Sequence, residues 1–119
     1  MPVLNEADYL EAAVSAVMEQ QTPGKKEVIL ALGPSTDKTN QIAKNLQKLH
    51  PEIALVENPT GLTSTGLNLA IEKSKYEVVI RVDAHSELSE NYALRAVETL
   101  NKTGAANVGG MMVAKGNTN

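Results

Sequence analysis

Residues 27–49 read EVILALGPSTDKTNQIAKNLQKL, an apolar run followed by a polar turn and an amphipathic segment. Residues 27–32 form a short, almost continuous apolar run, which predicts a strand buried on both faces. Residues 33–35 are a turn, and apolar residues then recur at helical spacing from about residue 37 to residue 49. A buried strand followed at once by a helix is typical of a parallel sheet covered by helices.

The same alternation continues on both sides of this stretch. Helices are predicted at residues 7–21, 37–49, 67–73 and 89–100, and strands at residues 27–32, 53–57, 77–82 and 107–113. Asn5 and Ser89 are the expected N-caps of the first and last helices, and Gly104 closes the last one. The sequence therefore predicts an α/β fold, a mostly parallel sheet with helices on both faces. The helix residues expected to face the core are Leu10, Ala13, Val14, Val17, Met18, Ile42, Ala43, Leu46, Leu49, Leu67, Ala70, Ile71, Ala93, Ala96, Val97 and Leu100.

The composition excludes several classes of protein. The 119 residues include no Cys, Trp or Phe and only 3 Tyr, so disulfides, Cys-based zinc sites and stacked aromatic platforms for nucleic acid are excluded. A net charge of −3 argues against a nucleic-acid surface or a polybasic membrane anchor. The longest apolar run is far too short for a membrane span, and no leader pattern is visible. We expect one soluble, cytoplasmic domain.

Most of the reactive polar residues fall in loops that follow predicted strands, which is where parallel sheets bind ligands. Residues 61–66, GLTSTG, have the spacing of a phosphate loop but continue with Leu67-Asn68 instead of Lys-Ser/Thr. Because a P-loop requires that Lys-Ser/Thr pair, a P-loop is excluded. No G-x-G-x-x-G follows any predicted strand, which excludes the dinucleotide-binding fingerprint as well. The loop is either a simple connection into a helix or a set of backbone amides lining a polyanion pocket.

Residues 81–85, RVDAH, carry the sharpest chemical signal. Arg81 and Asp83 end an apolar segment, where a buried charge needs a partner or a metal. Alternation along an extended chain places Arg81, Asp83 and His85 on one side. Carboxylate and imidazole suit Mn²⁺ or Mg²⁺ bridging a diphosphate; the alternative is an Arg81–Asp83 ion pair with His85 in a turn. Residues 35–37, STD, present a similar choice between capping a helix and lining a site.

Together these segments resemble glycosyltransferase family 2, the inverting enzymes of the GT-A fold. The resemblance rests on residues 2–6 (PVLNE), 35–37 (STD), 58–68 and 83–85 (DAH), in the family's order and spacing over essentially the whole chain. PVLNE, STD and RVDxH are most similar to the branch that builds succinoglycan-type exopolysaccharides. The resemblance implies the Rossmann-like, nucleotide-binding half of a GT-A fold.

The resemblance also implies roles for individual residues. The implied nucleotide-sugar-binding residues are Pro2, Leu4, Glu6, Ser35, Asp37, Asn68, Arg81 and Asp83. Asp83 stands at the first Asp of the family's D-x-D motif, and Asp83 and His85 are the implied ligands of a divalent metal, Mn²⁺ or Mg²⁺. Leu4 replaces a Tyr common in the family, residues 32–33 replace an acidic pair that contacts the base, and His85 replaces an Asp.

By this resemblance, the parent enzyme transfers a sugar from a nucleotide-diphosphate sugar, a UDP-sugar, to a saccharide or lipid-linked saccharide acceptor at the cytoplasmic face of a membrane. Residues 1–119 are then the donor-binding N-terminal part of the domain, incomplete at both ends. The first strand is largely missing, and the general base is expected beyond Asn119.

We therefore expect the chain alone to be inactive and to self-associate through unpaired strand edges, without binding nucleic acid. Two alternatives come from other classes: a non-catalytic nucleotide-binding module, and a nucleotidyltransferase. The second would carry a Gly-rich basic loop near its N-terminus, and residues 3–9 contain no such loop.

Overall fold

The computed structural model describes residues 1–84 and 88–104. Its strands are β1 (Pro2–Val3), β2 (Val28–Leu32) and β3 (Ile53–Glu57), which form one parallel sheet in the order β1-β2-β3. The register pairs Pro2 with Ala31 and Val28 with Ile53. Its helices are α1 (Leu10–Glu19), α2 (Thr39–Leu49), α3 (Thr63–Lys73) and α4 (Tyr92–Thr103). The predicted α/β class with a parallel sheet is confirmed.

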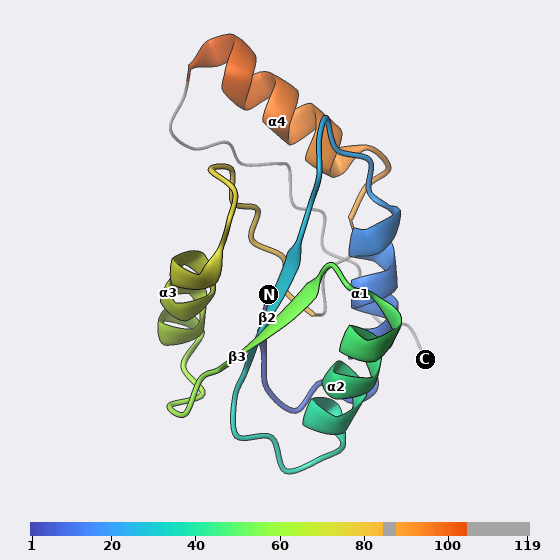
Figure 1. Ribbon diagram of the computed structural model, residues 1–119, viewed down its shortest axis with the longest axis vertical. Helices are drawn as coiled ribbons and strands as arrows, with labels where there is room; N and C mark the ends of the chain where they lie inside the picture. Colours follow the sequence, from blue (N-terminus) through green and yellow to red (C-terminus); the bar gives the residue numbers. More distant parts are fainter. Residues whose placement is uncertain (85–87, 105–119) are drawn as a thin grey trace, which may run out of the picture.

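The helices cover both faces of the sheet. Figure 1 shows α1 and α2 together on one side and α3 on the other. The connections from β1 to β2 and from β2 to β3 step across the sheet in one direction, so right-handed crossovers put α1 and α2 on the same face. After β3 the chain changes face, and α3 packs against β2, β3 and β1. Such a reversal marks the place where open α/β sheets bind ligands, at the carboxyl ends of the strands.

The central strand β2 is buried along its whole length, as its continuous apolar run predicts. Leu30 on β2 and Leu10 and Val14 on α1 are completely buried in one hydrophobic cluster. Full burial of one such side chain stabilises a fold by roughly 1.5–3 kcal/mol. The contact between β2 and α1 is therefore the centre of the core.

Two residues that were expected in the core are exposed. Leu49 is 72% exposed, because it is the last residue of α2 and the chain turns away into β3 directly after it. Ile71 is 48% exposed, because α3 turns Gly66 and Ala70 toward the sheet and Ile71 lies one position further around the helix.

All four helices begin at other residues than expected, and α2 differs least, beginning at Thr39. α1 begins at Leu10, after Tyr9, and Asn5 is no cap but adopts a positive φ of 52°. α3 begins earlier than expected, at Thr63. α4 follows Asn91, which has a φ of 60°, and ends at Gly104 as expected.

The side chain of Gln20, at the end of α1, takes the place expected for the cap Ser89. Its Oε1 accepts a hydrogen bond from the N–H of Ala93 at 2.9 Å, and its Nε2 donates to the backbone carbonyl of Ser89 at 3.0 Å. The start of α4 is thus held by a residue about 70 positions away in sequence, which no local pattern reveals.

The prediction of a strand at residues 77–82 is wrong. This segment joins no ladder with the strands that the structure describes, although Val82 is buried and Arg81 exposed, in the expected alternation. A strand needs a partner edge, and β1, beside which this segment lies, has only two residues in register. Val78 and Val79 of this segment are exposed. Self-association of the chain through unpaired strand edges stays a prediction. The strand expected at residues 107–113 lies outside the described residues.

Gly66 is where α3 packs closest to the sheet. A Cβ atom at Gly66 would lie 2.8 Å from Nδ2 of Asn58 and 3.4 Å from the Cβ atoms of Ala31 and Pro2. We predict that Gly66→Val lowers the free energy of unfolding by about 1–3 kcal/mol, measured by urea denaturation, because Asn58 must move. Gly24→Val is the control, since nothing lies within 4 Å of a Cβ there. Equal losses in both variants would contradict this packing.

The start of α2 depends on the charge of Asp37. Its Oδ1 accepts hydrogen bonds from Thr39, through the hydroxyl group and through the backbone N–H at 2.9 Å. These two bonds, with a weaker contribution from the N–H of Ala7, hold the pKa of the Asp37 carboxyl below its ordinary value of 3.8. A carboxyl with a lowered folded-state pKa stabilises the fold above its unfolded pKa and loses that contribution as the pH falls.

We predict that Asp37→Asn is less stable than wild type at pH 7 and that the difference shrinks as the pH falls below 3.8 toward 2. Urea denaturation of both proteins between pH 7 and pH 2 measures this difference. A difference that stayed constant over the whole range would mean that the charge of Asp37 has no part in holding α2.

Candidate functional site

The loops that leave β1, β2 and β3 emerge at one edge, because the three strands are parallel. Backbone hydrogen bonds continue the ladders into these loops. The N–H of Gly33 donates to the carbonyl of Val3 at 2.8 Å, and the N–H of Asn58 donates to the carbonyl of Leu32 at 2.8 Å. The three loops therefore start from fixed positions.

Two glycines let the three loops come together. A Cβ atom at Gly33 would lie 3.0 Å from Cδ1 of Leu4 and 3.3 Å from Cα of Gly61. Gly61 has a φ of 69°, in the left-handed region, and a Cβ there would lie 3.2 Å from Cδ of Pro34. A side chain at either glycine would push apart the loops after β1, β2 and β3.

Polar bonds join the first loop to the second. The N–H of Asn5 donates to Oγ of Ser35 at 2.9 Å, and the N–H of Thr36 donates to Oδ1 of Asn5 at 2.8 Å. Sequence reasoning missed this role of Asn5. The available signal was that Asn, more readily than most residues, adopts a positive φ.

The next two residues of the first loop are held by the start of α2. The N–H of Glu6 donates to Oγ1 of the fully buried Thr39 at 2.8 Å, and the N–H of Ala7 donates to Oδ2 of Asp37 at 3.3 Å. Residues 35–37 were expected either to hold the start of a helix or to line a site, and the first of these roles is present. Asp37 holds both the first turn of α2 and the loop after β1. A contact of Ser35 or Asp37 with a nucleotide stays a prediction.

The third loop is held mainly by Asn58, whose side chain is almost fully buried. Its Nδ2 donates to the carbonyl of Leu62 at 2.9 Å, and its Oδ1 accepts from the hydroxyl of Thr60 at 3.0 Å. No side chain caps the N-terminus of α3, which begins directly after this loop. Both readings of the loop, a simple connection and a polyanion pocket, remain compatible with this geometry.

Arg81 and Asp83 form the ion pair that was one of the two expectations for this segment. Nε of Arg81 donates to Oδ1 of Asp83 at 3.3 Å, and the side chains are 55% and 51% exposed. The expectation that these charges are buried is wrong, because the segment lies outside the sheet. Burial lowers the pKa of the α-amino group of Met1 to about 6, while Asp83 raises it and Arg81 lowers it. Val82 and Ala84 belong to the same buried cluster as Met1 and Val3, so this segment packs beside β1.

The implied metal ligand His85 lies outside the described residues. Within residues 1–84 and 88–104, no group of three or more His, Asp or Glu side chains could hold a metal ion by itself. Asp83 nevertheless fits the role of a partial ligand, because its carboxylate is half exposed and is a hard oxygen donor of the kind that Mg²⁺ and Mn²⁺ prefer.

The predicted binding residues do not all meet at one point. Leu4, Glu6, Ser35 and Asp37 belong to the two joined loops. The others are Pro2, which faces Gly66 of α3; Asn68, exposed on α3; and Arg81, paired with Asp83.

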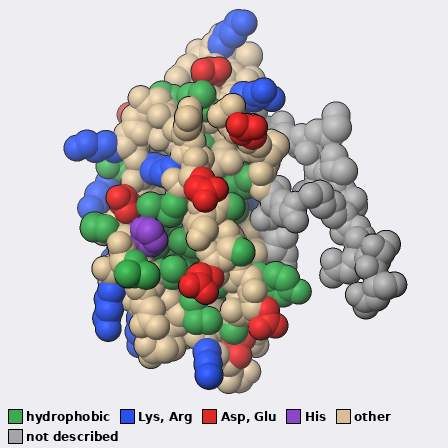
Figure 2. All heavy atoms as spheres, turned by 90° about the vertical axis from the view of Figure 1, so that its right-hand side faces the viewer, with side chains coloured by type: hydrophobic (Ala, Val, Ile, Leu, Met, Phe, Trp, Pro, Cys, Tyr) green, Lys and Arg blue, Asp and Glu red, His purple; other side chains and the backbone are tan. Residues whose placement is uncertain are grey.

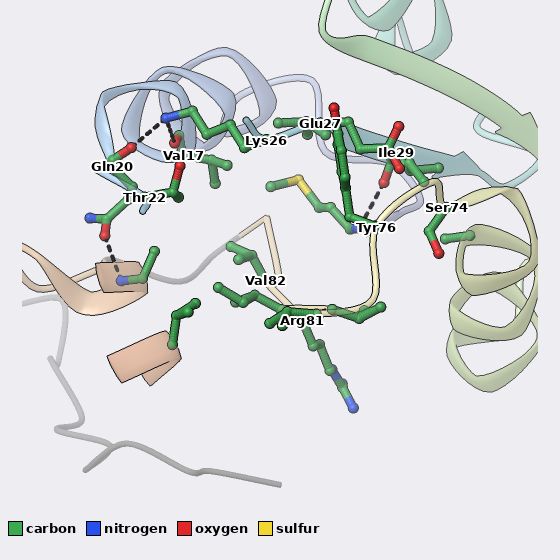
Figure 3. Close-up of a pocket in the computed structure, with 18 of the residues that line it drawn as sticks. Val17, Gln20, Thr22, Lys26, Glu27, Ile29, Ser74, Tyr76, Arg81 and Val82 are labelled. Atoms are coloured by element: carbon green, nitrogen blue, oxygen red, sulfur yellow. Dashed lines mark hydrogen bonds between the residues drawn. The ribbon is translucent and has the colours of Figure 1, made fainter. Parts of the chain in front are cut away.

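A cavity of about 390 Å³ lies away from these loops, among Met1, β2, residues 74–82 and α4 (Figure 3). Its lining is mostly apolar. In Figure 3, Lys26 turns back to α1, where Nζ donates to the carbonyls of Val17 at 3.2 Å and Met18 at 2.6 Å. Among the predicted site residues that the structure describes, Arg81 is the one that lines this cavity, so the cavity does not coincide with the predicted donor-binding loops.

The surface gives no single charged patch over α1 and α2. Figure 2 shows acidic, basic and apolar side chains side by side on this face. In the part of the chain that the structure describes, no helix is both long enough and apolar enough to cross a membrane.

The whole chain, residues 1–119, matches the family described as Glycosyl transferase family 2. It is 34% identical over 110 residues to the succinoglycan biosynthesis protein ExoA of Rhizobium meliloti, an alignment that covers 91% of this chain and 33% of the relative. It is 29% identical over 112 residues to the glycosyltransferase AglE of Haloferax volcanii, covering 92% and 37%. No solved structure matches the chain significantly.

This chain spans about a third of the length of these curated relatives, at 33% and 37%. The similarity to a succinoglycan biosynthesis protein confirms the resemblance to the exopolysaccharide branch. The parallel sheet, with its loops joined at the carboxyl edge, agrees with the nucleotide-binding half of a GT-A fold. The chain belongs to glycosyltransferase family 2.

Proposed function

We propose that this chain supplies the nucleotide-sugar site of an inverting glycosyltransferase that builds an exopolysaccharide or another cell-surface polysaccharide. One observation carries the proposal: three loops pack together at the carboxyl edge of the sheet, in a chain that matches the family from end to end. That edge is where open α/β sheets bind ligands. The printed names of the relatives, succinoglycan biosynthesis protein and glycosyltransferase, support the class of reaction.

The proposed donor is a UDP-sugar that lies across the ends of β1 and β2. Leu4, which is 39% exposed, offers an apolar surface to the base, and the joined loops set its position. The proposed donor-binding set is Pro2, Leu4, Glu6, Ser35, Asp37, Asn68, Arg81 and Asp83. Ser35 and Asp37 act within it chiefly by fixing the backbone that surrounds the nucleotide.

The diphosphate is proposed to meet Asp83 and Arg81. A divalent cation bound by Asp83 and His85 would neutralise charge on the departing diphosphate, the usual Lewis-acid role. Arg81 lies beside Asp83 and offers a second positive charge to the same group. The acceptor hydroxyl attacks the anomeric carbon opposite the departing diphosphate, inverting the centre, and its proton passes to a base that we assign to no residue of this chain.

Nucleotide titration tests the donor site and the metal together. We predict that isothermal titration calorimetry shows tighter binding of UDP than of GDP or TDP, and tighter binding with Mn²⁺ than without it. Asp83→Asn removes a charged oxygen ligand, so it should lower the affinity for UDP with Mn²⁺ by about 10–100-fold, the usual effect of disturbing a metal site. His85→Ala should act in the same direction.

The matched control is Glu77→Gln, which neutralises an exposed carboxylate on the same segment without touching the proposed ligands. This variant should keep the full gain from Mn²⁺. If Mn²⁺ raises the affinity of the wild-type chain for none of the three nucleotides, the proposed metal site is wrong.

We also predict that the purified 119-residue chain binds the donor and transfers no sugar, because no residue of this chain is assigned as the base. The measurement is the release of UDP from a UDP-sugar in the presence of a saccharide acceptor, compared with the release to water alone. Release that depends on the acceptor would contradict this prediction.

A further inference from the structure

Asn5 has a backbone conformation that most residues avoid, at the point where the chain leaves the sheet. Its φ of 52° lies in the left-handed region, and Asn91 is the one other non-glycine residue with a positive φ among those the structure describes. A strained backbone persists only where the surroundings hold it in place. The contacts of Asn5 identify what holds it.

The hydrogen bonds of Asn5 are reciprocal and reach across two loops. Its N–H donates to Oγ of Ser35 at 2.9 Å, and its Oδ1 accepts from the N–H of Thr36 at 2.8 Å and from the hydroxyl of Thr36 at 3.3 Å. All three bonds are exposed to solvent. Exposed bonds of this kind add little to global stability, because water replaces them readily. Their main effect is to fix one loop relative to the other.

The residue that this link controls is Leu4, directly before Asn5. Cδ1 of Leu4 lies 3.0 Å from the Cβ position of Gly33, and Cδ2 lies 3.6 Å from that of Gly61. Leu4 therefore rests on the two glycines that bring the loops together. Without the bonds to Thr36, the side chain of Asn5 no longer ties the loop after β1 to the loop after β2, and the backbone that carries Leu4 is free to shift relative to Gly33.

We propose that Asn5 is a positioning residue for donor binding, one whose amide oxygen holds the loop after β1 against the loop after β2. The proposal rests on the proposed function, and it assigns Asn5 no contact with the donor. The two loops are then already ordered in the free protein, so the free energy of nucleotide binding is not reduced by the cost of ordering them. Removal of the amide oxygen should weaken donor binding without removing any group that touches the donor.

Two substitutions separate the amide oxygen from the backbone conformation. Asn5→Gly permits the positive φ without strain but lacks the acceptor. Asn5→Asp keeps an acceptor oxygen at the same distance from the backbone and serves as the conservative rescue. Asn91→Gly is the matched control, since it makes the same change at the other positive-φ Asn, at the start of α4.

The first readout needs no ligand: hydrogen exchange of the Thr36 amide, followed by NMR. We expect faster exchange in Asn5→Gly, by roughly tenfold, and exchange near the wild-type rate in Asn5→Asp and Asn91→Gly. Unchanged exchange in Asn5→Gly, or fast exchange in Asn5→Asp, would overturn the link between the loops.

The second readout is the affinity for UDP with Mn²⁺. Loss of one hydrogen bond should weaken binding by about 3–10-fold in Asn5→Gly, with affinity restored in Asn5→Asp and unchanged in Asn91→Gly. Faster Thr36 exchange with an unchanged affinity would overturn the positioning role alone. If the wild-type chain binds no nucleotide, the proposed function fails and donor positioning fails with it, while the exchange result still decides whether the link exists.

Discussion

The complete burial of β2 is the constraint on which the rest of the structure depends. Because all five residues of β2 are buried, its backbone groups need partners inside the fold. β3 pairs with the whole strand on one side, and β1 pairs with its carboxyl end on the other. Parallel pairing in turn requires helical crossovers, which cover the faces of the sheet. The same pairing brings all strand-leaving loops to one edge. The candidate site is thus a consequence of how β2 is buried.

At that edge, side chains divide into those that hold the loops and those that remain available. The first group comprises Asn5, Ser35 and Asp37, whose side chains accept hydrogen bonds from backbone N–H groups of the adjoining loop. Leu4 and Asp83 keep exposed surface. In the proposed function, the first group acts chiefly by fixing the backbone around the nucleotide, and the second group acts by direct contact with the donor or its metal. A polar residue in a loop of this kind can therefore matter for binding without touching the ligand.

Local patterns were enough to predict β2, β3 and most of α2, because apolar runs and helical spacing depend on neighbouring residues. They failed where the deciding partner is distant. Asn5 looks like a helix cap in sequence, but its partner Thr36 is 31 positions away. Residues 77–82 have strand propensity, but β1 offers too short an edge for pairing. The same limit applies to the candidate site. Local patterns predict the loop after β2, but they do not reveal the hydrogen bonds that join it to the loop after β1.

The exposure of the Arg81–Asp83 pair bears directly on the proposed metal. An ion pair that is half exposed contributes roughly 0–1 kcal/mol, so a cation can replace Arg81 at the carboxylate at little cost. A buried pair would resist, because removing one partner from a buried pair costs about 3–5 kcal/mol. From the sequence, these charges are expected to be buried, where each needs a partner or a metal. The observed exposure also favours Asp83 as a metal ligand, because its carboxylate is open to a cation that arrives with the diphosphate of the donor.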